Sequence, residues 1–323
     1  YAVYKAIVVA GFKPEYLDIA KGDLNFSAEG FEQALQKNPE IKVLMVQNTL
    51  GFACEAPRIA AICRQQGIIL IEDLAHSAGA RYFGGGQAGT VGDFAVLSFS
   101  QDKMIDAVSG GALIIRNKKY QNVDLSDLGE VKVGQRIMDR WYPMLTFKIR
   151  TGYSLGLGKT IHKLYKILGL LSQPMGSMEI ISLHKLPAWY CAFALREFQN
   201  LENNLRHRRE IAKVYAAHLN PKILFKYLLP QISGASNLRF PILVEDRAGL
   251  VGHLKNYGIH ISDIWYDAPV APEKYLLMTD YHGQCQNAEL VSKKMLNLPT
   301  HININSAQAK NLAEKINQWL QSA

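Results

Sequence analysis

A continuous apolar run between a helix and a pair of acids constrains the fold of this chain more than any other feature. The run covers residues 68–71 and ends at Glu72 and Asp73. Helical spacing precedes it over residues 57–66, with a proline in the first turn, where proline is tolerated, and with Gly67 at the end. Because a short apolar run next to a helix is typical of a parallel strand buried on both faces, the pattern predicts an α/β fold.

Three further apolar runs extend the predicted sheet. They cover residues 43–47, 94–99 and 112–115. Ligands of open α/β sheets bind beyond the carboxyl ends of the strands. Asp73 and Ser98 fall at such ends, and we therefore expect the functional site to lie there.

The length of 323 residues is enough for about two domains. We place the boundary near residue 218, at the end of a long helix predicted over residues 187–218, which gives domains 1–218 and 219–323. The second domain shows another α/β pattern. We expect strands over 239–244 and 259–261, a helix over 247–257 and a terminal helix over 307–320.

Positive charge is concentrated in one segment of the chain. Residues 131–175 hold eight lysines and arginines and one acid, Asp139, whereas the formal charge of the whole chain is +8. The same segment is rich in aromatic and aliphatic residues. It fits a helical flap packed on a partner subunit with solvated lysines, or an amphipathic segment lying in a membrane interface. Since no recognised nucleic-acid motif accompanies the charge, we expect no nucleic-acid partner.

Cysteine usage and hydropathy favour a cytoplasmic protein. None of the four cysteines forms a C-x-x-C pair, and their spacing suggests neither a metal site nor a disulfide framework. No apolar run reaches the length of about 18 residues that a membrane-spanning helix needs. A peripheral contact with the inner face of the membrane is expected only if residues 131–175 bind lipid. The sequence has neither an initiator Met nor a basic start, so we expect it to begin inside a longer protein.

An acid, a histidine, a serine and a lysine follow one another in the order that an enzyme needs to hold pyridoxal phosphate (PLP). Asp73 could hold the proton of the pyridine nitrogen, which makes the ring an electron sink. His76 could cover the ring face. Ser98 could bind the phosphate, and Lys103 could form the Schiff base if its surroundings keep the amine unprotonated. Each of these residues alone is more often structural, so the prediction depends on their combination.

Residues 41–115 resemble the DegT/DnrJ/StrS family of PLP-dependent aminotransferases, which act mostly on nucleotide-linked keto sugars. The acid-ended strand of that family is matched by Asp73, and its ring-stacking residue three positions later by His76. Its Ser-Phe-x-x-x-Lys element is matched by residues 98–103. A lysine at that position separates the transaminases from the family's dehydratases, which carry histidine. Further similarity covers residues 110–111, an early strand within 11–19, residues 206–215 and a late strand at 296–300.

The resemblance implies a fold type I PLP-dependent transferase that works as a homodimer. Its large domain would be an α/β/α layer with a mostly parallel sheet, and a small C-terminal α/β domain would follow. The implied reaction moves an amino group, with glutamate as the expected donor, to a keto group on a nucleotide-linked sugar. Lys103 would be the catalytic residue, and Asp73, His76 and Ser98 would bind the cofactor. No metal is expected.

The sequence departs from the family pattern in three places. The family's Gly-Thr element, which binds the cofactor phosphate, should precede Tyr1. The family's Asn-Tyr-Arg element, which reaches the phosphate from a neighbouring subunit, falls near residues 182–185, where His184 or Lys185 could replace it. Residues 131–175 are longer than the usual connection.

Two alternatives stay open at this point. The same scaffold could run another PLP reaction, such as that of a lyase. The chain could also be a non-catalytic remnant that binds a partner or a membrane through residues 131–175. By analogy, residues 265–267 are expected in a loop near the substrate.

Overall fold

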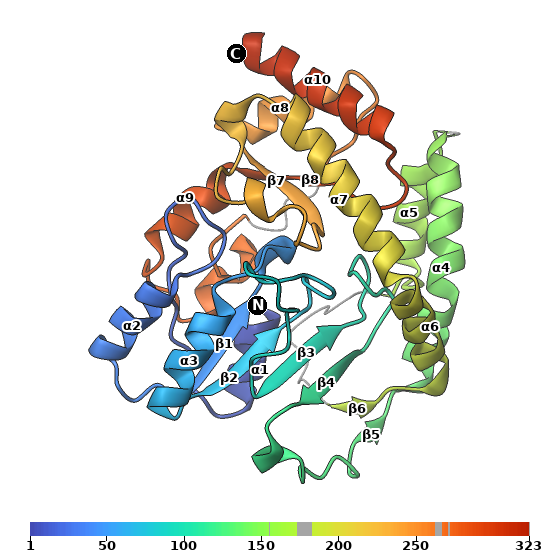
Figure 1. Ribbon diagram of the computed structural model, residues 1–323. Coiled ribbons are helices and arrows are strands. Elements are labelled where there is room, and N and C mark those ends of the chain that lie inside the picture. The colour runs from blue at the N-terminus through green and yellow to red at the C-terminus, as the bar shows by residue number, and fades with distance from the viewer. Residues whose placement is uncertain (155, 173–182, 262–266, 271, 323) are drawn as a thin grey trace. The chain divides into compact units, whose positions relative to one another are not determined.

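The computed structural model of the chain describes residues 1–154, 156–172, 183–261, 267–270 and 272–322 (Figure 1). Internal contacts divide it into two compact units. Unit 1 consists of Tyr1–Leu97, Leu113–Gln121 and Asn200–Ala323, and unit 2 of Ser98–Ala112 and Asn122–Gln199. The domain boundary predicted near residue 218 comes from the sequence pattern rather than from internal contacts, and it stays a prediction.

A four-stranded sheet occupies the region of the predicted apolar runs. Its strands lie in the order β1 (Val43–Gln47), β2 (Ile69–Asp73), β3 (Phe94–Ser98) and β4 (Gly111–Ile115). The first three strands are parallel, with Gln47 opposite Asp73 and Asp73 opposite Val96. The predicted strands and their parallel pairing are confirmed.

Two helices pack beside this sheet within unit 1: α2 (Ala28–Lys37) and α3 (Ala56–Gln66) (Figure 1). The helix α3 has Pro57 in its first turn and ends at Gly67, whose φ of +66° suits glycine. Phe31 and Ile59 from the helices and Leu70 from β2 belong to one buried apolar cluster. Burial of these side chains explains why the strand sequence is continuously apolar rather than alternating.

The C-terminal part of unit 1 has its own apolar core. The strands β7 (Arg239–Leu243) and β8 (Met295–Pro299) pair antiparallel. Helix α10 packs on α7 and α8, and side chains from these helices and from the two strands form a second buried cluster. The helices are α7 (Leu201–His218), α8 (Arg247–Lys255), α9 (Gln286–Lys294) and α10 (Ser306–Ser322).

Three sequence predictions about single elements are wrong. The N-terminal residues form a helix, α1 (Ala2–Val9), and residues 11–19 form no strand. Residues 259–261 form no strand either, because the Ile259 N–H closes the end of α8 by bonding the Leu254 carbonyl. The predicted long helix is two helices, α6 (Ala188–Gln199) and α7, separated at Asn200, a residue type that favours helix ends.

Unit 2 is mainly helical. In addition to α6, it contains α4 (Val133–Ser154) and α5 (Gly158–Ile167). Two short strands, β5 (Gly129–Glu130) and β6 (His184–Lys185), pair in parallel. Helices α4 and α5 pack on each other (Figure 1), and a Cβ on Gly152 would meet Ile161 Cδ1 at 2.7 Å. Helices thus cover most of the described part of the predicted segment 131–175, of which residues 155 and 173–175 lie outside the described residues.

The remaining regular segments are short 3₁₀ turns. They cover Thr49–Gly51, Lys118–Tyr120, Pro221–Ile223, Leu229–Gln231 and Glu273–Met278. Within the described ranges, no helix combines the length and the apolar character needed to cross a bilayer.

Candidate active site

Asp73 is a buried acid at the carboxyl end of β2, with 7% of its surface exposed. Its Oδ1 accepts a hydrogen bond from the Ala75 N–H at 2.8 Å, and its Oδ2 accepts one from Gln47 Nε2 at 3.3 Å. Gln47 reaches it because the two residues are opposite each other in neighbouring parallel strands. The carboxylate is thus oriented by donors on both of its oxygens.

Glu72, the other acid of the pair, has a structural role. Its side chain is fully buried, and its two oxygens accept backbone N–H groups of Gly89, Val91 and Gly92 at 2.7–2.9 Å as well as the Tyr82 hydroxyl. Burial and the bond to Glu72 raise the pKa of Tyr82 above its ordinary value. Successive side chains of a strand point to opposite faces. The Glu72 side chain therefore binds the 89–92 loop, whereas the Asp73 side chain lies on the opposite face at the end of the strand.

His76 is held from both its ring and its backbone. The ring Nδ1 accepts the Leu50 N–H at 3.3 Å, so the proton of a neutral ring belongs on Nε2. Leu50 itself has a left-handed φ of 54°, which is uncommon for a residue with a branched side chain. The His76 carbonyl accepts the Ser236 hydroxyl at 2.6 Å. With 5% of its surface exposed, the imidazole has a fixed position.

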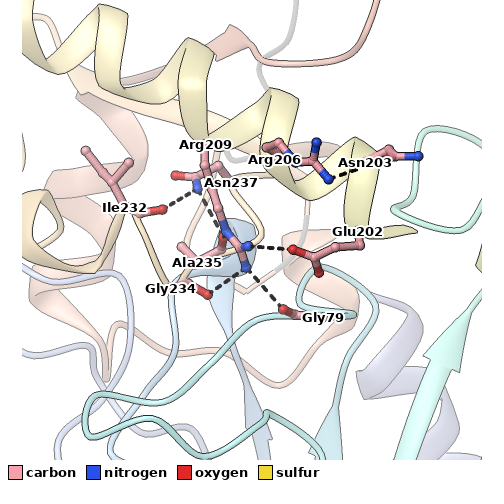
Figure 2. Close-up of polar contacts among 9 residues, drawn as sticks. All are labelled: Gly79, Glu202, Asn203, Arg206, Arg209, Ile232, Gly234, Ala235 and Asn237. Atoms are coloured by element: carbon pink, nitrogen blue, oxygen red, sulfur yellow. Dashed lines mark hydrogen bonds and ion pairs between the residues drawn. The ribbon is translucent and has the colours of Figure 1, made fainter. Parts of the chain in front are cut away.

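Arg209 holds the chain just after His76 (Figure 2). Its Nη2 bonds the Gly79 carbonyl at 3.4 Å and the Gly234 carbonyl at 3.5 Å, and its Nε bonds the Ala235 carbonyl at 3.1 Å. Glu202 lies 3.6 Å from Nη1. Burial lowers the pKa of Arg209 from its ordinary value. One guanidinium therefore joins helix α7, the turn at 234–235 and the segment that carries His76.

Lys103 lies in a closed loop of unit 2. The Phe99 N–H bonds the Gly110 carbonyl and the Ala107 N–H bonds the Phe99 carbonyl, both at 2.9 Å. Within the loop, the Asp106 carboxylate accepts the N–H groups of Asp102 at 3.1 Å and Val108 at 2.9 Å. The two residues after Lys103 are buried, and Lys103 itself is half-buried. The loop therefore fixes the base of the lysine side chain.

Ser98 ends β3 and is paired with a second serine. Its Oγ lies 3.0 Å from Ser100 Oγ, and the Ser100 N–H approaches it at 3.5 Å. Two hydroxyls and an N–H at one strand end are donors of the kind that bind phosphate oxygens. Ser100 was not predicted, although positions 98 and 100 share one face of an extended chain.

The structure divides the predicted residues between the two units. Asp73 and His76 belong to unit 1, three residues apart, and Ser98 and Lys103 belong to unit 2. Their roles stay predictions. Of the segments expected near the substrate or at the subunit contact, Ser182, Trp265 and Tyr266 lie outside the described residues, whereas His184 and Lys185 are exposed in β6.

Each unit holds groups that suit a part of PLP. A buried oriented carboxylate suits a protonated ring nitrogen, a half-buried lysine suits the aldehyde, and paired hydroxyls suit the phosphate. Across the described residues, no group of three or more histidines, cysteines and acids could hold a metal ion. Three residues that hold Asp73, His76 and the segment after His76 were not predicted from the sequence: Gln47, Ser236 and Arg209. Only Gln47 had a local signal, its place at the end of the strand before Asp73.

Comparison with known proteins identifies the scaffold. The family model of the DegT/DnrJ/EryC1/StrS aminotransferases matches residues 1–150 and 168–317. A UDP-4-amino-4,6-dideoxy-N-acetyl-beta-L-altrosamine transaminase of Campylobacter jejuni is 24% identical over 96% of this chain and 74% of its own length. A GDP-perosamine synthase of Caulobacter vibrioides is 22% identical over 98% of this chain and 75% of its own.

A solved structure shares the fold. The PLP form of a Streptococcus pneumoniae protein described as a sugar aminotransferase superposes with a TM-score of 0.68 at 17% identity. The alignment covers 98% of this chain and 77% of that one. The chain thus spans about three quarters of the length of each of these proteins.

Proposed function

The chain belongs to the DegT/DnrJ/EryC1/StrS aminotransferase family, and from this membership we propose that it aminates a keto group of a nucleotide-linked sugar. It is a PLP-dependent enzyme of fold type I. The relatives named above use UDP- and GDP-linked sugars by their names, which supports this substrate class. Glutamate is the proposed amino donor.

The observation that carries the proposal is that each unit fixes one of the groups PLP needs: the buried carboxylate of Asp73 in unit 1 and the lysine of the closed 99–110 loop in unit 2. When bound, PLP supplies an electron sink for the carbon that loses a proton. Asp73 would hold the proton at the ring nitrogen. His76 would orient the ring, and the hydroxyls of Ser98 and Ser100 would donate to phosphate oxygens. Lys103 Nζ would bind the aldehyde carbon and, when released, take up and return the proton of the substrate carbon.

Exposed apolar residues on α6 support a homodimer. Phe193, Leu195 and Phe198 are each at least half exposed, and the same helix carries one cation, Arg196, and one acid, Glu197. Exposed apolar side chains with balanced charge suit contact with a second copy of the chain. We propose α6 as part of this contact. The molar mass in solution should fall to that of one chain when Phe193→Ser and Phe198→Ser are combined.

The four cysteines support the proposed cytoplasmic location. All of them are free thiols, and burial raises the pKa of Cys54, Cys63 and Cys285 to about 12. Thiols that stay protonated and unpaired suit a reducing compartment.

A spectroscopic titration tests the proposal. PLP is added to the purified chain, to Lys103→Ala and to the control Lys118→Ala, which removes an exposed lysine. We expect the visible band of lysine-bound PLP in the parent and in the control, and its loss in Lys103→Ala. Borohydride reduction should then leave the cofactor mass on the peptide that contains Lys103.

Product analysis separates the proposed reaction from its rivals. With glutamate and a panel of nucleotide-linked keto sugars, the parent and Lys118→Ala should form an amino sugar and 2-oxoglutarate, and Lys103→Ala should lose about 10³-fold or more of that rate. A product without nitrogen would indicate a lyase. Full transamination by Lys103→Ala would overturn the assignment of the lysine, and a parent chain that binds no PLP would overturn the assignment of function.

A further inference from the structure

The helical pair α4–α5 presents only positive charge to its surroundings. Of the nine charged residues between 131 and 175, eight are cations, and all of these are exposed except the half-buried Arg136. The cations are Lys132, Arg136, Arg140, Lys148, Arg150, Lys159, Lys163 and Lys166. The remaining charged residue, Asp139, is 0% exposed. The pair itself therefore carries no exposed acid, and from the 99–110 loop Asp106 interacts electrostatically with Arg150.

Asp139 is occupied inside unit 2. Its Oδ1 accepts Gln135 Nε2 at 2.6 Å and Ser172 Oγ at 2.5 Å, and its Oδ2 accepts the Tyr190 hydroxyl at 2.5 Å. Burial and the bond to Asp139 raise the pKa of Tyr190 above its ordinary value. The carboxylate thus fastens α4 to α6 and to Ser172 and is unavailable to a ligand outside the chain.

Apolar side chains lie among these cations and are exposed in the described part of the chain. The buried face of α4 includes Leu145 and Ile149. A different face repeats apolar residues every three or four positions, at Val133, Ile137, Trp141 and Met144, and leaves them exposed. Trp141 is 52% and Phe147 is 65% exposed. On α5 and its ends the exposed apolar side chains are Leu157, Leu164, Ile167 and Leu168.

Charge decides which partner this face fits. A second copy that packed this face on itself across a two-fold axis would bring like charges together, and the rest of the chain, with a net charge of +1, has no overall acidic surplus. A nucleic acid would pair with the cations but would leave the apolar stripe in water. Anionic phospholipid satisfies both, because its headgroups pair with lysine and arginine while aromatic and aliphatic side chains enter the interface.

We propose that the α4–α5 pair docks this enzyme on the surface of a bilayer that contains anionic phospholipid. The pair would lie on the bilayer, since no helix in the described part of the chain could span it. The family model skips residues 151–167, which contain the end of α4 and all of α5. This surface is therefore partly an addition to the shared enzyme scaffold.

Vesicle flotation of the PLP-loaded full chain tests the proposal. We expect flotation with phosphatidylcholine vesicles that contain phosphatidylglycerol, little flotation with phosphatidylcholine alone, and loss of binding as salt is added. The charge variant combines Lys148→Gln, Lys159→Gln and Lys163→Gln. Its partition coefficient should fall about tenfold or more.

A matched control removes the same charge elsewhere. Lys222→Gln, Lys226→Gln and Lys310→Gln change exposed lysines of unit 1 and should leave flotation unchanged. An apolar variant, Trp141→Ser with Leu164→Ser, should also weaken binding. Circular dichroism confirms folding, and transaminase activity measured without vesicles should stay at the parent level, which keeps this test independent of the proposed reaction.

Four outcomes would overturn the proposal. They are equal flotation with neutral and anionic vesicles, equal loss in the charge variant and its control, and a parent chain that floats with neither kind of vesicle. The fourth is preference for an RNA oligonucleotide that displaces the chain from anionic vesicles. A chain that ignores vesicles but becomes monomeric in the apolar variant would assign the face to a second copy.

Discussion

The two compact units differ in how fully their helices bury large apolar side chains. In unit 1 the sheet strands and their helices share two buried clusters, and Phe31, Tyr215 and Ile242 have no exposed surface. In unit 2 large apolar side chains such as Trp141, Phe147 and Phe193 are at least half exposed. Helices α2, α3, α7, α8 and α10 of unit 1 thus contribute side chains to its buried clusters, whereas α4, α5 and α6 of unit 2 keep large apolar side chains exposed. The predicted cofactor residues are divided between these two environments.

The largest effect that would sharpen this contrast is expected from crowding the interior of unit 1. A Cβ at Gly51, whose φ is +92°, would lie 1.9 Å from Ser236 Oγ and 3.0 Å from the His76 carbonyl. Gly51→Ala should therefore cost about 3 kcal/mol or more of unfolding free energy in urea. It should also weaken PLP binding, because His76 is displaced.

Gly67→Ala is the matched control for Gly51→Ala. Gly67 also has a positive φ, +66°, but a Cβ there would meet nothing within 4 Å. It should lose only about 1–2 kcal/mol, the cost of the backbone conformation. Equal losses at the two glycines would show that the turn beside His76 is not tightly packed.

A smaller effect is expected from the buried acid of unit 2. Asp139→Asn places an amide N–H₂ where three donors converge, and we expect a loss of about 2 kcal/mol in urea unfolding. Tyr190→Phe removes one of these bonds and should lose about 1 kcal/mol. An Asp139→Asn variant as stable as the parent would mean that unit 2 does not depend on this polar cluster, and the contrast between the units would weaken.

The smallest effect concerns the cysteines. Cys54, Cys63 and Cys285 are buried in unit 1, and Cys191 is exposed in unit 2. A disulfide reagent at about pH 8 should label one thiol of the native chain quickly, and Cys191→Ser should abolish that phase while changing stability by less than about 0.5 kcal/mol. Fast labelling of a second thiol would contradict the packing of unit 1.

The same thiols predict in which direction the stability of the fold changes with pH. Burial raises the pKa of Cys54, Cys63 and Cys285 from 9.0 to about 12. Because the pKa of each thiol is higher in the folded state than in the unfolded state, its contribution to the free energy of unfolding is fully present below about pH 9. This contribution is lost as the pH rises towards about 12. Urea midpoints should therefore fall over this range. Constant midpoints would contradict the burial of the thiols.

The elements that depend on the sequence close to them in the chain could be predicted from local patterns. The apolar run 68–71, flanked by a helix and two acids, was enough to predict β2, its parallel neighbours and the place of Asp73. The sequence could not show that Glu72 rather than Asp73 binds the 89–92 backbone, since that depends on which face of the strand each side chain takes. It also could not show that Ser236 holds His76, because these residues lie 160 positions apart. The break at Asn200 was missed because apolar spacing continues across it.

Arg209 has a consequence for anyone who redesigns this enzyme. Its guanidinium bonds the carbonyls of Gly79, Gly234 and Ala235, so two loops that are distant in the chain share one donor group (Figure 2). An insertion or a deletion in either loop would move an acceptor that the other loop relies on. When loops are exchanged with those of a relative, both segments and the arginine should therefore be transferred together.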